Sequence, residues 1–243
     1  MGGDEVFVPS STKNLRKSCM ARFLISAFCL LLLFGYGCGT KQKPVAPEPE
    51  LTVGEQAAMQ RVALWHTLIE EGQVAPIDEK LAMVNRFFNR LEFVDDLSHW
   101  GKEDYWATPT EMLVSNGGDC EDFAIAKYLT LIQMQVPVER LRLTYVKSLK
   151  LNKPHMVLSY YATATGEPLL LDSLTAQVVL ASQRPDLLPV YSFNGEGLWQ
   201  AKQRGDEKPV GSAARLSLWQ EVLQRFQNEA KAATSSPPGR GTR

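Results

Sequence analysis

The chain has 243 residues, of which 44% are hydrophobic and 22% charged, and its net charge is −1. This composition is typical of an ordinary globular protein and, once the ends are trimmed, suits one domain with a sizeable core. Without clustered basic charge, the sequence excludes the electrostatic footprint of a nucleic-acid-binding domain.

Residues 1–38 are predicted to be a signal peptide or a membrane anchor. Basic residues precede the apolar run Phe23–Phe34, which is the anatomy of an export signal. The run is shorter than the roughly 20 residues of a membrane-spanning helix. Small residues before Cys38 suit a signal peptidase, the cysteine hints at a lipoprotein signal, and Met20 is an alternative start. We therefore expect an exported protein, with a Pro-, Lys- and Glu-rich linker at residues 39–54.

Hydrophobic periodicity changes along the chain from a helical to a strand spacing. Apolar residues at helical spacing predict helices, and alternating patterns predict strands in the second half. The predicted helices cover 55–71, 77–90, 109–114 and 216–230, with a further helix from Cys120, and the predicted strands cover 141–146, 154–161, 168–172, 190–194 and 197–199. Helices followed by an antiparallel sheet predict an α+β domain at residues 55–230, and a frayed tail at 231–243.

An aromatic and acidic loop at residues 91–106 follows the second predicted helix. Two interpretations stay open for it, because loops carry functional sites but also simply cover cores. The loop either protects an edge of the core or forms one wall of a cleft. It ends just before Thr108-Pro109-Thr110-Glu111, a capping box with proline at the first helical position, which predicts the start of a short helix.

The segment Asn116–Tyr128 is predicted to be a glycine turn that leads directly into a helix. Asp119 suits the N-cap, so that Cys120 falls in the first turn, where the helix dipole favours a thiolate. Cys120 is the only cysteine beyond residue 38. A lone cysteine is either a small buried hydrophobe or a free thiol with a function, and the charged residues on both sides argue against core packing. We therefore predict a cysteine nucleophile.

The acidic residues around the cysteine oppose a thiolate. Asp119, Glu121 and Asp122 all lie within two residues of Cys120, and negative neighbours disfavour a second negative charge. They are either ordinary capping residues of a first helical turn or ligands of a hard cation such as calcium, which prefers carboxylate oxygens.

A cysteine–histidine–carboxylate arrangement accounts for the polar residues of the predicted sheet. Of three histidines, only His155 interrupts an apolar strand pattern, and Asp172 ends the next predicted strand. In this interpretation His155 exchanges the proton of Cys120 and Asp172 orients the imidazole. A simple hairpin centred on residues 165–166 places Asp172 opposite Tyr160 instead, so their meeting requires a bulge or a neighbouring strand. The oxyanion is expected to bind the Cys120 amide and one donor from the loop, Tyr105 or Trp106.

Six segments together resemble the bacterial transglutaminase-like cysteine proteinases. The resemblance spans about residues 84–199 and rests on Asn85–Asn89, Asp104–Glu111, Gly118–Ala124, His155–Leu158, Leu171–Leu174 and Val190–Asn194. It implies a papain-like, transglutaminase-type fold with N-terminal helices packed on an antiparallel sheet. It also implies a Cys120/His155/Asp172 triad. Ser173 departs from the asparagine expected after the aspartate, which puts in doubt only the contacts of that side chain.

The resemblance implies a cofactor, a substrate and a partner as well. The cofactor is calcium, bound through Asp119 and Glu121 together with Asp122. The substrate is a large RTX-type surface adhesin, cleaved in the periplasm near its N-terminus at an Ala-Ala site, which disperses biofilm. The partner is an inner-membrane cyclic-di-GMP receptor of the LapD type. Two alternatives remain: a transglutaminase-type acyl transferase and an inactive relative that only binds the receptor.

Overall fold

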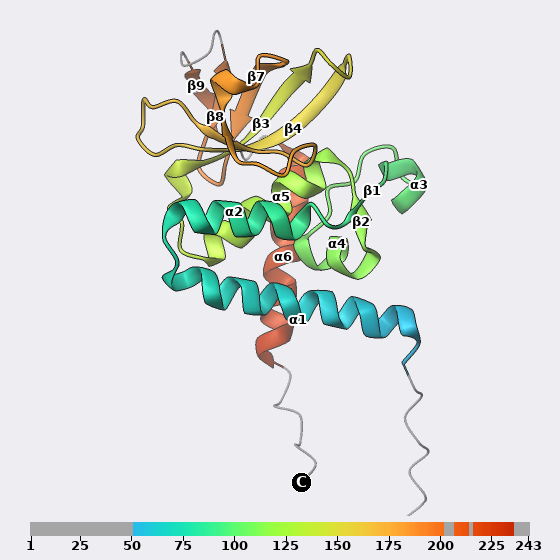
Figure 1. The fold of residues 1–243 in the computed structure, drawn as a ribbon. Helices are drawn as coiled ribbons and strands as arrows, with labels where there is room; N and C mark the ends of the chain where they lie inside the picture. The colour runs from blue at the N-terminus through green and yellow to red at the C-terminus, as the bar shows by residue number, and fades with distance from the viewer. Residues whose placement is uncertain (1–50, 202–206, 214–215, 236–243) are drawn as a thin grey trace, which may run out of the picture. The chain divides into compact units, whose positions relative to one another are not determined.

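A seven-stranded antiparallel sheet packs with one face on a group of helices (Figure 1). The computed structural model describes residues 51–201, 207–213 and 216–235, all within the unit Pro49–Arg243. The predicted signal peptide or anchor, most of the predicted linker and residues 236–243 of the predicted tail lie outside the described residues. Among the helices of the described part, none combines the length and hydrophobicity that crossing a membrane requires.

The observed order of elements confirms the α+β prediction. The helices are α1 (Val53–Val74), α2 (Ile77–Phe88), α3 (Asp96–Trp100), α4 (Pro109–Ser115), α5 (Cys120–Gln133) and α6 (Ser217–Ser235), with short 3₁₀ turns η1 (Val138–Arg140) and η2 (Ala181–Gln183). The strands are β1 (Glu92–Phe93), β2 (Gly117–Gly118), β3 (Leu141–Ser148), β4 (Lys153–Tyr160), β5 (Leu169–Leu171), β6 (Val179–Leu180), β7 (Leu187–Phe193), β8 (Leu198–Ala201) and β9 (Glu207–Gly211). The large sheet has the order β6-β5-β4-β3-β7-β8-β9, and β1 pairs with β2 in a separate parallel pair.

Local sequence signals explain where the helices begin. The predicted capping box at Thr108 is confirmed, since Thr108 Oγ1 accepts from the Glu111 amide at 3.1 Å and Glu111 Oε2 accepts from the Thr108 amide at 2.8 Å. A second capping box, between Thr52 and Glu55, starts α1 two residues earlier than predicted. The helix also continues beyond Gly72, because this glycine permits close packing: an added Cβ would lie 2.5 Å from Met134 Sδ.

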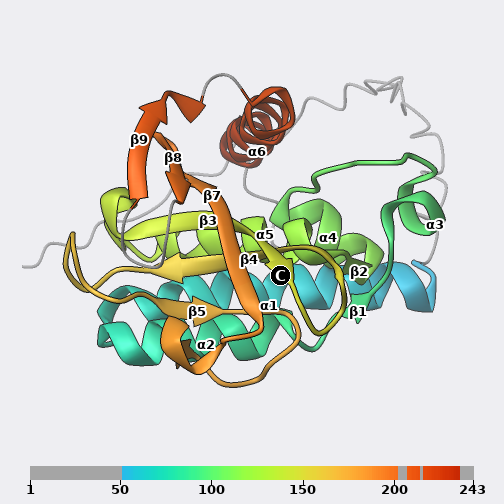
Figure 2. The ribbon, with the colours of Figure 1, turned by 90° about the horizontal axis from the view of Figure 1, so that it is seen from above.

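Helix α5 is the centre of the core. It lies beneath β3 and β4 and also contacts α1, α2 and α4 (Figure 2). Every residue from Asp122 to Leu131 is buried, so α5 is covered on all sides and does not show a single apolar stripe. Because the sheet and three helices pack around α5, its N-terminus, which carries Cys120, is held in a defined position.

The ends of the sheet and of the chain differ from the prediction. The two-residue strands β1, β2 and β6 are too short to show an alternating pattern, and β9 was also missed. Helix α6 continues to Ser235, so the first five residues of the predicted tail, 231–235, are helical.

Candidate active site

Gly117 and Gly118, just before Cys120, allow neighbouring parts of the chain to pack closely against them. The turn prediction is wrong here, because Gly117 and Gly118 form β2 and pair with Glu92 and Phe93. The left-handed backbone falls on Asn116, with φ of 66°. An added Cβ would lie 2.9 Å from Glu92 O at Gly117 and 2.5 Å from Asp122 Oδ2 at Gly118. Glycine is therefore required by space and not by unusual dihedral angles.

Cys120 is the first residue of α5, as predicted, and Asp119 occupies the N-cap position. Asp122 fastens this helix start to its surroundings. Its Oδ2 accepts from the Asp119 amide at 3.2 Å, and its Oδ1 accepts from the Ala107 amide at 2.6 Å. The buried carboxylate therefore fixes the loop before α4 against the residues that carry the thiol.

The thiol of Cys120 is half-buried and donates a hydrogen bond to Glu121 Oε2 at 2.9 Å. Burial, followed by the negative charges of Glu121 and Asp119, raises the pKa of Cys120 far above its ordinary value. A backbone hydrogen bond from Met156 of β4 acts in the opposite direction and lowers that pKa. With bare carboxylates around it, the sulfur therefore keeps its proton.

His155 and Asp172 meet in the interior. Their Nε2 and Oδ1 atoms are 2.7 Å apart, and the side chains are only 2% and 0% exposed. The expectation that a bulge or a third strand must join them is wrong. The β4–β5 register pairs Leu158 with Leu171, so Asp172 comes opposite Val157, two residues from His155. Such diagonal neighbours lie on the same face and within side-chain reach.

Asp172 is held as a carboxylate in this buried position. Burial by itself raises its pKa, but hydrogen bonds from His155, the Leu174 amide and Arg184 lower the pKa to about 2. The group therefore stays ionised throughout the physiological range, as an orienting acid for an imidazole must.

Cys120 and His155 are connected in this structure through the backbone of β4, and no hydrogen bond joins the two side chains among the described residues. The sulfur lies at the Met156 amide, next to His155 in the chain, and α5 packs directly on β4. The hydrogen bond of the thiol goes to Glu121 and that of the imidazole to Asp172. Because Nε2 is used by Asp172, Nδ1 is the ring nitrogen left to exchange a proton. Catalytic hydrogen bonds are often loose before substrate binds.

Carboxylates from the aromatic loop join those at the helix start. Sequence reasoning noted the acidity of this loop but did not single out Asp96 and Asp104. Three overlapping groups each have ligand atoms within 4.8 Å of one another: Asp119, Cys120 and Glu121; Asp96, Asp104 and Glu121; and Asp96, Asp119 and Asp122. The loop is thus more than a cover for the core, because it supplies charge next to the predicted nucleophile.

Asp96, Asp104, Asp119, Glu121 and Asp122, which we call the acidic group, fit a hard divalent cation. Burial, with the repulsion of the neighbouring acids, raises the pKa of Asp96 to about 6, of Asp122 to about 8 and of Asp119 to about 9. The Oδ1 atoms of Asp96 and Asp119 are buried and have no hydrogen-bond partner among the described residues. Crowded, buried carboxylates with free lone pairs are the donor set that calcium prefers.

The two candidates from the loop for an oxyanion donor have other partners in this structure. The Tyr105 hydroxyl donates to Glu111 Oε1 at 2.9 Å. The Trp106 side chain hydrogen-bonds Asp104, and its ring stacks on Phe193. A role for either side chain at the oxyanion stays a prediction. The amide of Met156 is the donor that the structure places beside the sulfur.

Comparison with known proteins gives a family and several related structures. A family model described as bacterial transglutaminase-like cysteine proteinase matches residues 68–199. Three solved structures of LapG from Legionella pneumophila are 46% identical to this chain and cover 70% of it. The EGTA-treated structure gives a TM-score of 0.64 over 89% of its length, a second LapG structure 0.63 over 88%, and the calcium-bound structure 0.62 over 91%. No curated protein sequence matches the chain.

Proposed function

Because this chain belongs to the bacterial transglutaminase-like cysteine proteinases, a family of cysteine peptidases with a transglutaminase-like α+β fold, we propose that Cys120, His155 and Asp172 are its catalytic triad. The observation that carries this proposal is the buried 2.7 Å contact between His155 and Asp172, beside the strand residue that hydrogen-bonds the Cys120 sulfur. Each residue has a distinct role in the reaction.

The proposed reaction is a two-step acyl transfer. The Cys120 thiol gives its proton to Nδ1 of His155, and the sulfur attacks the carbonyl carbon of the scissile peptide bond. The imidazolium, stabilised by the ionised Asp172, then protonates the leaving amine, which departs and leaves a thioester on Cys120. Water activated by His155 cleaves the thioester and regenerates the thiol. The Met156 amide is suitably placed to stabilise negative charge near the sulfur.

We propose calcium as the resident metal, held by Asp119, Glu121 and Asp122 and, in addition, by Asp96 and Asp104. The unpartnered oxygens of Asp96 and Asp119 support this ligand set, and one of the related LapG structures is calcium-bound. Calcium would supply positive charge that compensates the carboxylates crowded around the thiol. Glu121, which accepts from the thiol in this structure, then no longer opposes its deprotonation.

The biological setting of the proposal rests on the family and on the predicted export signal. We propose that the protein is exported to the periplasm, either soluble or tethered to the inner membrane. There it cleaves an RTX-type adhesin near its N-terminus at an Ala-Ala site and so promotes biofilm dispersal. An inner-membrane cyclic-di-GMP receptor of the LapD type is the proposed regulator. Residues 55–230 are the proposed protease domain.

The proposal is tested with the N-terminal fragment of an RTX adhesin that carries an Ala-Ala site. In the presence of calcium the wild-type protein is expected to cut this fragment at that site, and Cys120→Ala to leave it intact while retaining its fold by circular dichroism. Mass spectrometry of the products distinguishes a cut chain from a crosslinked one. A crosslink in place of a cut, or cleavage by the Cys120→Ala protein, contradicts the proposal.

A further inference from the structure

The guanidinium of Arg184 contacts Asp172, and neither the sequence analysis nor the proposed triad gives this residue a role. Arg184 Nη1 is 2.5 Å from Asp172 Oδ2, and the two side chains are 15% and 0% exposed. On its other side, Arg184 donates from Nε to Asp186 Oδ1 and from Nη2 to Asp186 Oδ2, both at 2.9 Å. One guanidinium therefore joins the carboxylate behind His155 to a second carboxylate nearer the surface.

We infer that Arg184 and Asp186 are positioning residues, which together hold the carboxylate of Asp172 in the orientation that it needs to bind His155. The inference rests on the proposed role of Asp172. Arg184 bonds directly to Asp172, and Asp186 bonds to Arg184, so we place the effect of both residues on Asp172. We call the Arg184–Asp186 pair the clamp.

The division of contacts on Asp172 shows why a clamp is needed. Oδ1 accepts from His155 Nε2 at 2.7 Å and from the Leu174 amide at 3.0 Å, while Oδ2 accepts from Arg184. Without the guanidinium, this fully buried Oδ2 loses its ion-pair partner, which is costly for a charge with no access to water. The carboxylate then lowers its energy by rotating or by taking up a proton, and either change weakens its bond to His155.

The second carboxylate matters because it sets both the geometry and the charge of the clamp. A planar guanidinium that binds Asp186 through two parallel hydrogen bonds cannot turn freely, so the direction of Nη1 is fixed. Pro185 stands between the two residues and limits the backbone that carries them. Asp186 also balances the positive charge of Arg184. Without Asp186, the uncompensated cation of Arg184 would compete with the imidazolium of His155 for the negative charge of Asp172.

The groups that face Asp172 come from several elements. Arg184 follows η2, His155 lies on β4, and the buried Lys127 of α5 interacts with Asp172 by charge.

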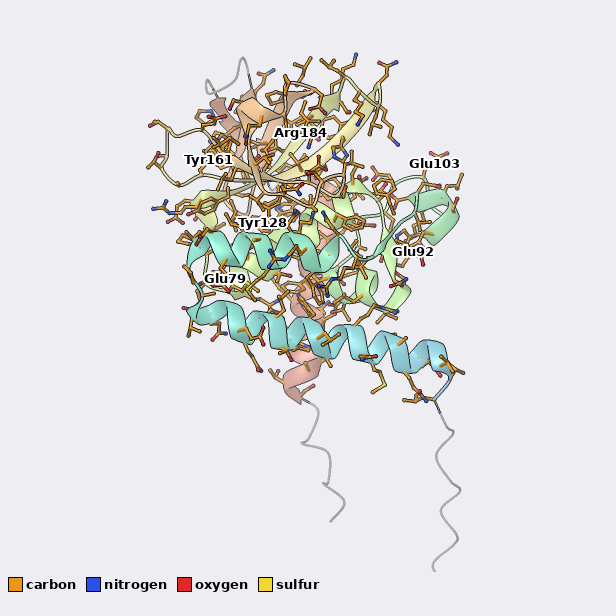
Figure 3. The ribbon with its side chains drawn as sticks, viewed as in Figure 1. Glu79, Glu92, Glu103, Tyr128, Tyr161 and Arg184 are labelled. Carbon is orange, nitrogen blue, oxygen red and sulfur yellow. The ribbon has the colours of Figure 1, made fainter. Side chains whose placement is uncertain are left out.

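Arg184 lies in the sheet half of the molecule, away from α1 and α2 (Figure 3). There it lines a cavity of about 550 Å³ together with Val157, Leu170 and Trp199. A small cation that enters this cavity can therefore reach the place of a deleted Arg184 side chain.

The test uses the full chain and the adhesin fragment, with calcium present. Arg184→Ala is expected to lower kcat about 100-fold with a KM within 3-fold of wild type, and Asp186→Asn to lower kcat about 10-fold. Added guanidinium chloride at low millimolar concentration is expected to restore at least 10-fold of the Arg184→Ala loss. Arg184→Lys keeps the positive charge but loses the planar guanidinium, and its kcat is expected to lie between those of wild type and Arg184→Ala. Arg61→Ala, which removes a guanidinium of α1 that bonds to Leu113 O of α4 and to no triad residue within the described part of the chain, is the matched control and is expected to stay within 3-fold.

A second readout needs no substrate. The Nε2 proton of His155, bonded to Asp172, is expected to give a downfield proton NMR signal that Asp172→Asn abolishes and Arg184→Ala broadens or shifts upfield. If the signal and kcat of the Arg184→Ala and Asp186→Asn proteins match wild type, the inference is overturned. If Asp172→Asn itself keeps full activity, the proposed triad fails instead. Should Arg184→Ala not fold, Arg184→Lys and Asp186→Asn decide the question by the same two readouts.

Discussion

At the scale of single residues, two opposing effects act on the sulfur of Cys120. The start of a helix stabilises a negative charge by about 0.3–1 kcal/mol, and at most about 2. A carboxylate about 4 Å away costs roughly 4 kcal/mol at the effective dielectric constant of a protein surface. Glu121 Oε2 lies 2.9 Å from the sulfur, so the carboxylates win unless their charge is compensated.

A substitution at Glu121 separates these effects. In the presence of EGTA, Glu121→Gln is expected to raise the rate of Cys120 alkylation by iodoacetamide at neutral pH about 10-fold or more, because the thiol loses a negative neighbour. Glu103→Gln changes an acid beside α3 (Figure 3) and is expected to leave the rate near wild type. Equal rates for wild type and Glu121→Gln would show that this carboxylate does not hold the thiol proton.

Lys127 gives a prediction on pH and stability. Burial lowers its pKa from 10.5 to about 7, although the charge of Asp172 opposes the shift, and Nζ has no hydrogen-bond partner among the described residues. The unfolded chain therefore binds more protons than the folded chain between pH 7 and 10.5, and the contribution of Lys127 to stability rises with pH across this window. The penalty is largest below pH 7.

The comparison that isolates this group is wild type against Lys127→Met. The free energy of unfolding of wild type, relative to the variant, is expected to rise by roughly 3–4 kcal/mol from pH 7 to 10. Urea unfolding at several pH values measures it, and the difference removes the contributions of cysteine and tyrosine. A difference that is flat with pH would mean that Lys127 is charged in the folded protein.

Residue types and motifs were enough to predict Cys120, His155 and Asp172 as candidates. They were not enough for Asp96, Asp104 or Arg184. Asp96 and Asp104 lie in a loop whose path depends on β1 pairing with β2, a contact of two residues on each side. Arg184 reaches Asp172 only because β6 and η2 fold the chain back along β5. Both depend on tertiary packing that no local pattern records.

At the scale of elements, the junction between β2 and α5 sets the position of the nucleophile. Gly118 leaves room for Asp122, whose carboxylate ties Asp119 and Ala107 together. Gly118→Ala is expected to destabilise the protein by about 1–3 kcal/mol and to weaken calcium binding, because the new Cβ displaces this carboxylate.

Urea unfolding and calcium titration by calorimetry measure both effects. Gly54→Ala, whose Cβ meets nothing closer than Thr52 Oγ1 at 3.9 Å in the first turn of α1, is the control and is expected to be neutral or slightly stabilising. A Gly118→Ala protein with wild-type stability and calcium affinity would show that Asp122 does not need this space.

Strand positions were predicted from periodicity, but the pairing of β4 with β5 was not. Centring the hairpin on residues 165–166 places Asp172 opposite Tyr160, three residues from its observed partner Val157, and this is enough to separate His155 from Asp172. The alternating pattern of β4 fixes which residues share a face and leaves the length of the connection open. The observed register of Leu158 with Leu171 restores the contact.

At the scale of the whole molecule, the acidic group links the aromatic loop to α5, so the metal is expected to contribute to overall stability. Calcium at 100 times its dissociation constant adds about 2.7 kcal/mol to the free energy of unfolding. EGTA is therefore expected to lower the melting temperature and to abolish cleavage, with both restored by excess calcium. Asp96→Asn is expected to weaken calcium binding. Activity that does not change with EGTA would contradict the proposed role of calcium, while the proposed peptidase activity would be unaffected.

The covalent step is the most direct test of the whole account. The calcium-loaded wild-type protein is mixed with the adhesin fragment, the reaction is stopped in acid within its first turnover, and the intact protein is analysed by mass spectrometry. The account predicts an added mass equal to the N-terminal product minus one water, as a thioester requires, located on Cys120 by peptide mapping and missing from the Cys120→Ala protein. Cleavage that proceeds with no adduct on Cys120, or an adduct on another residue, would contradict it.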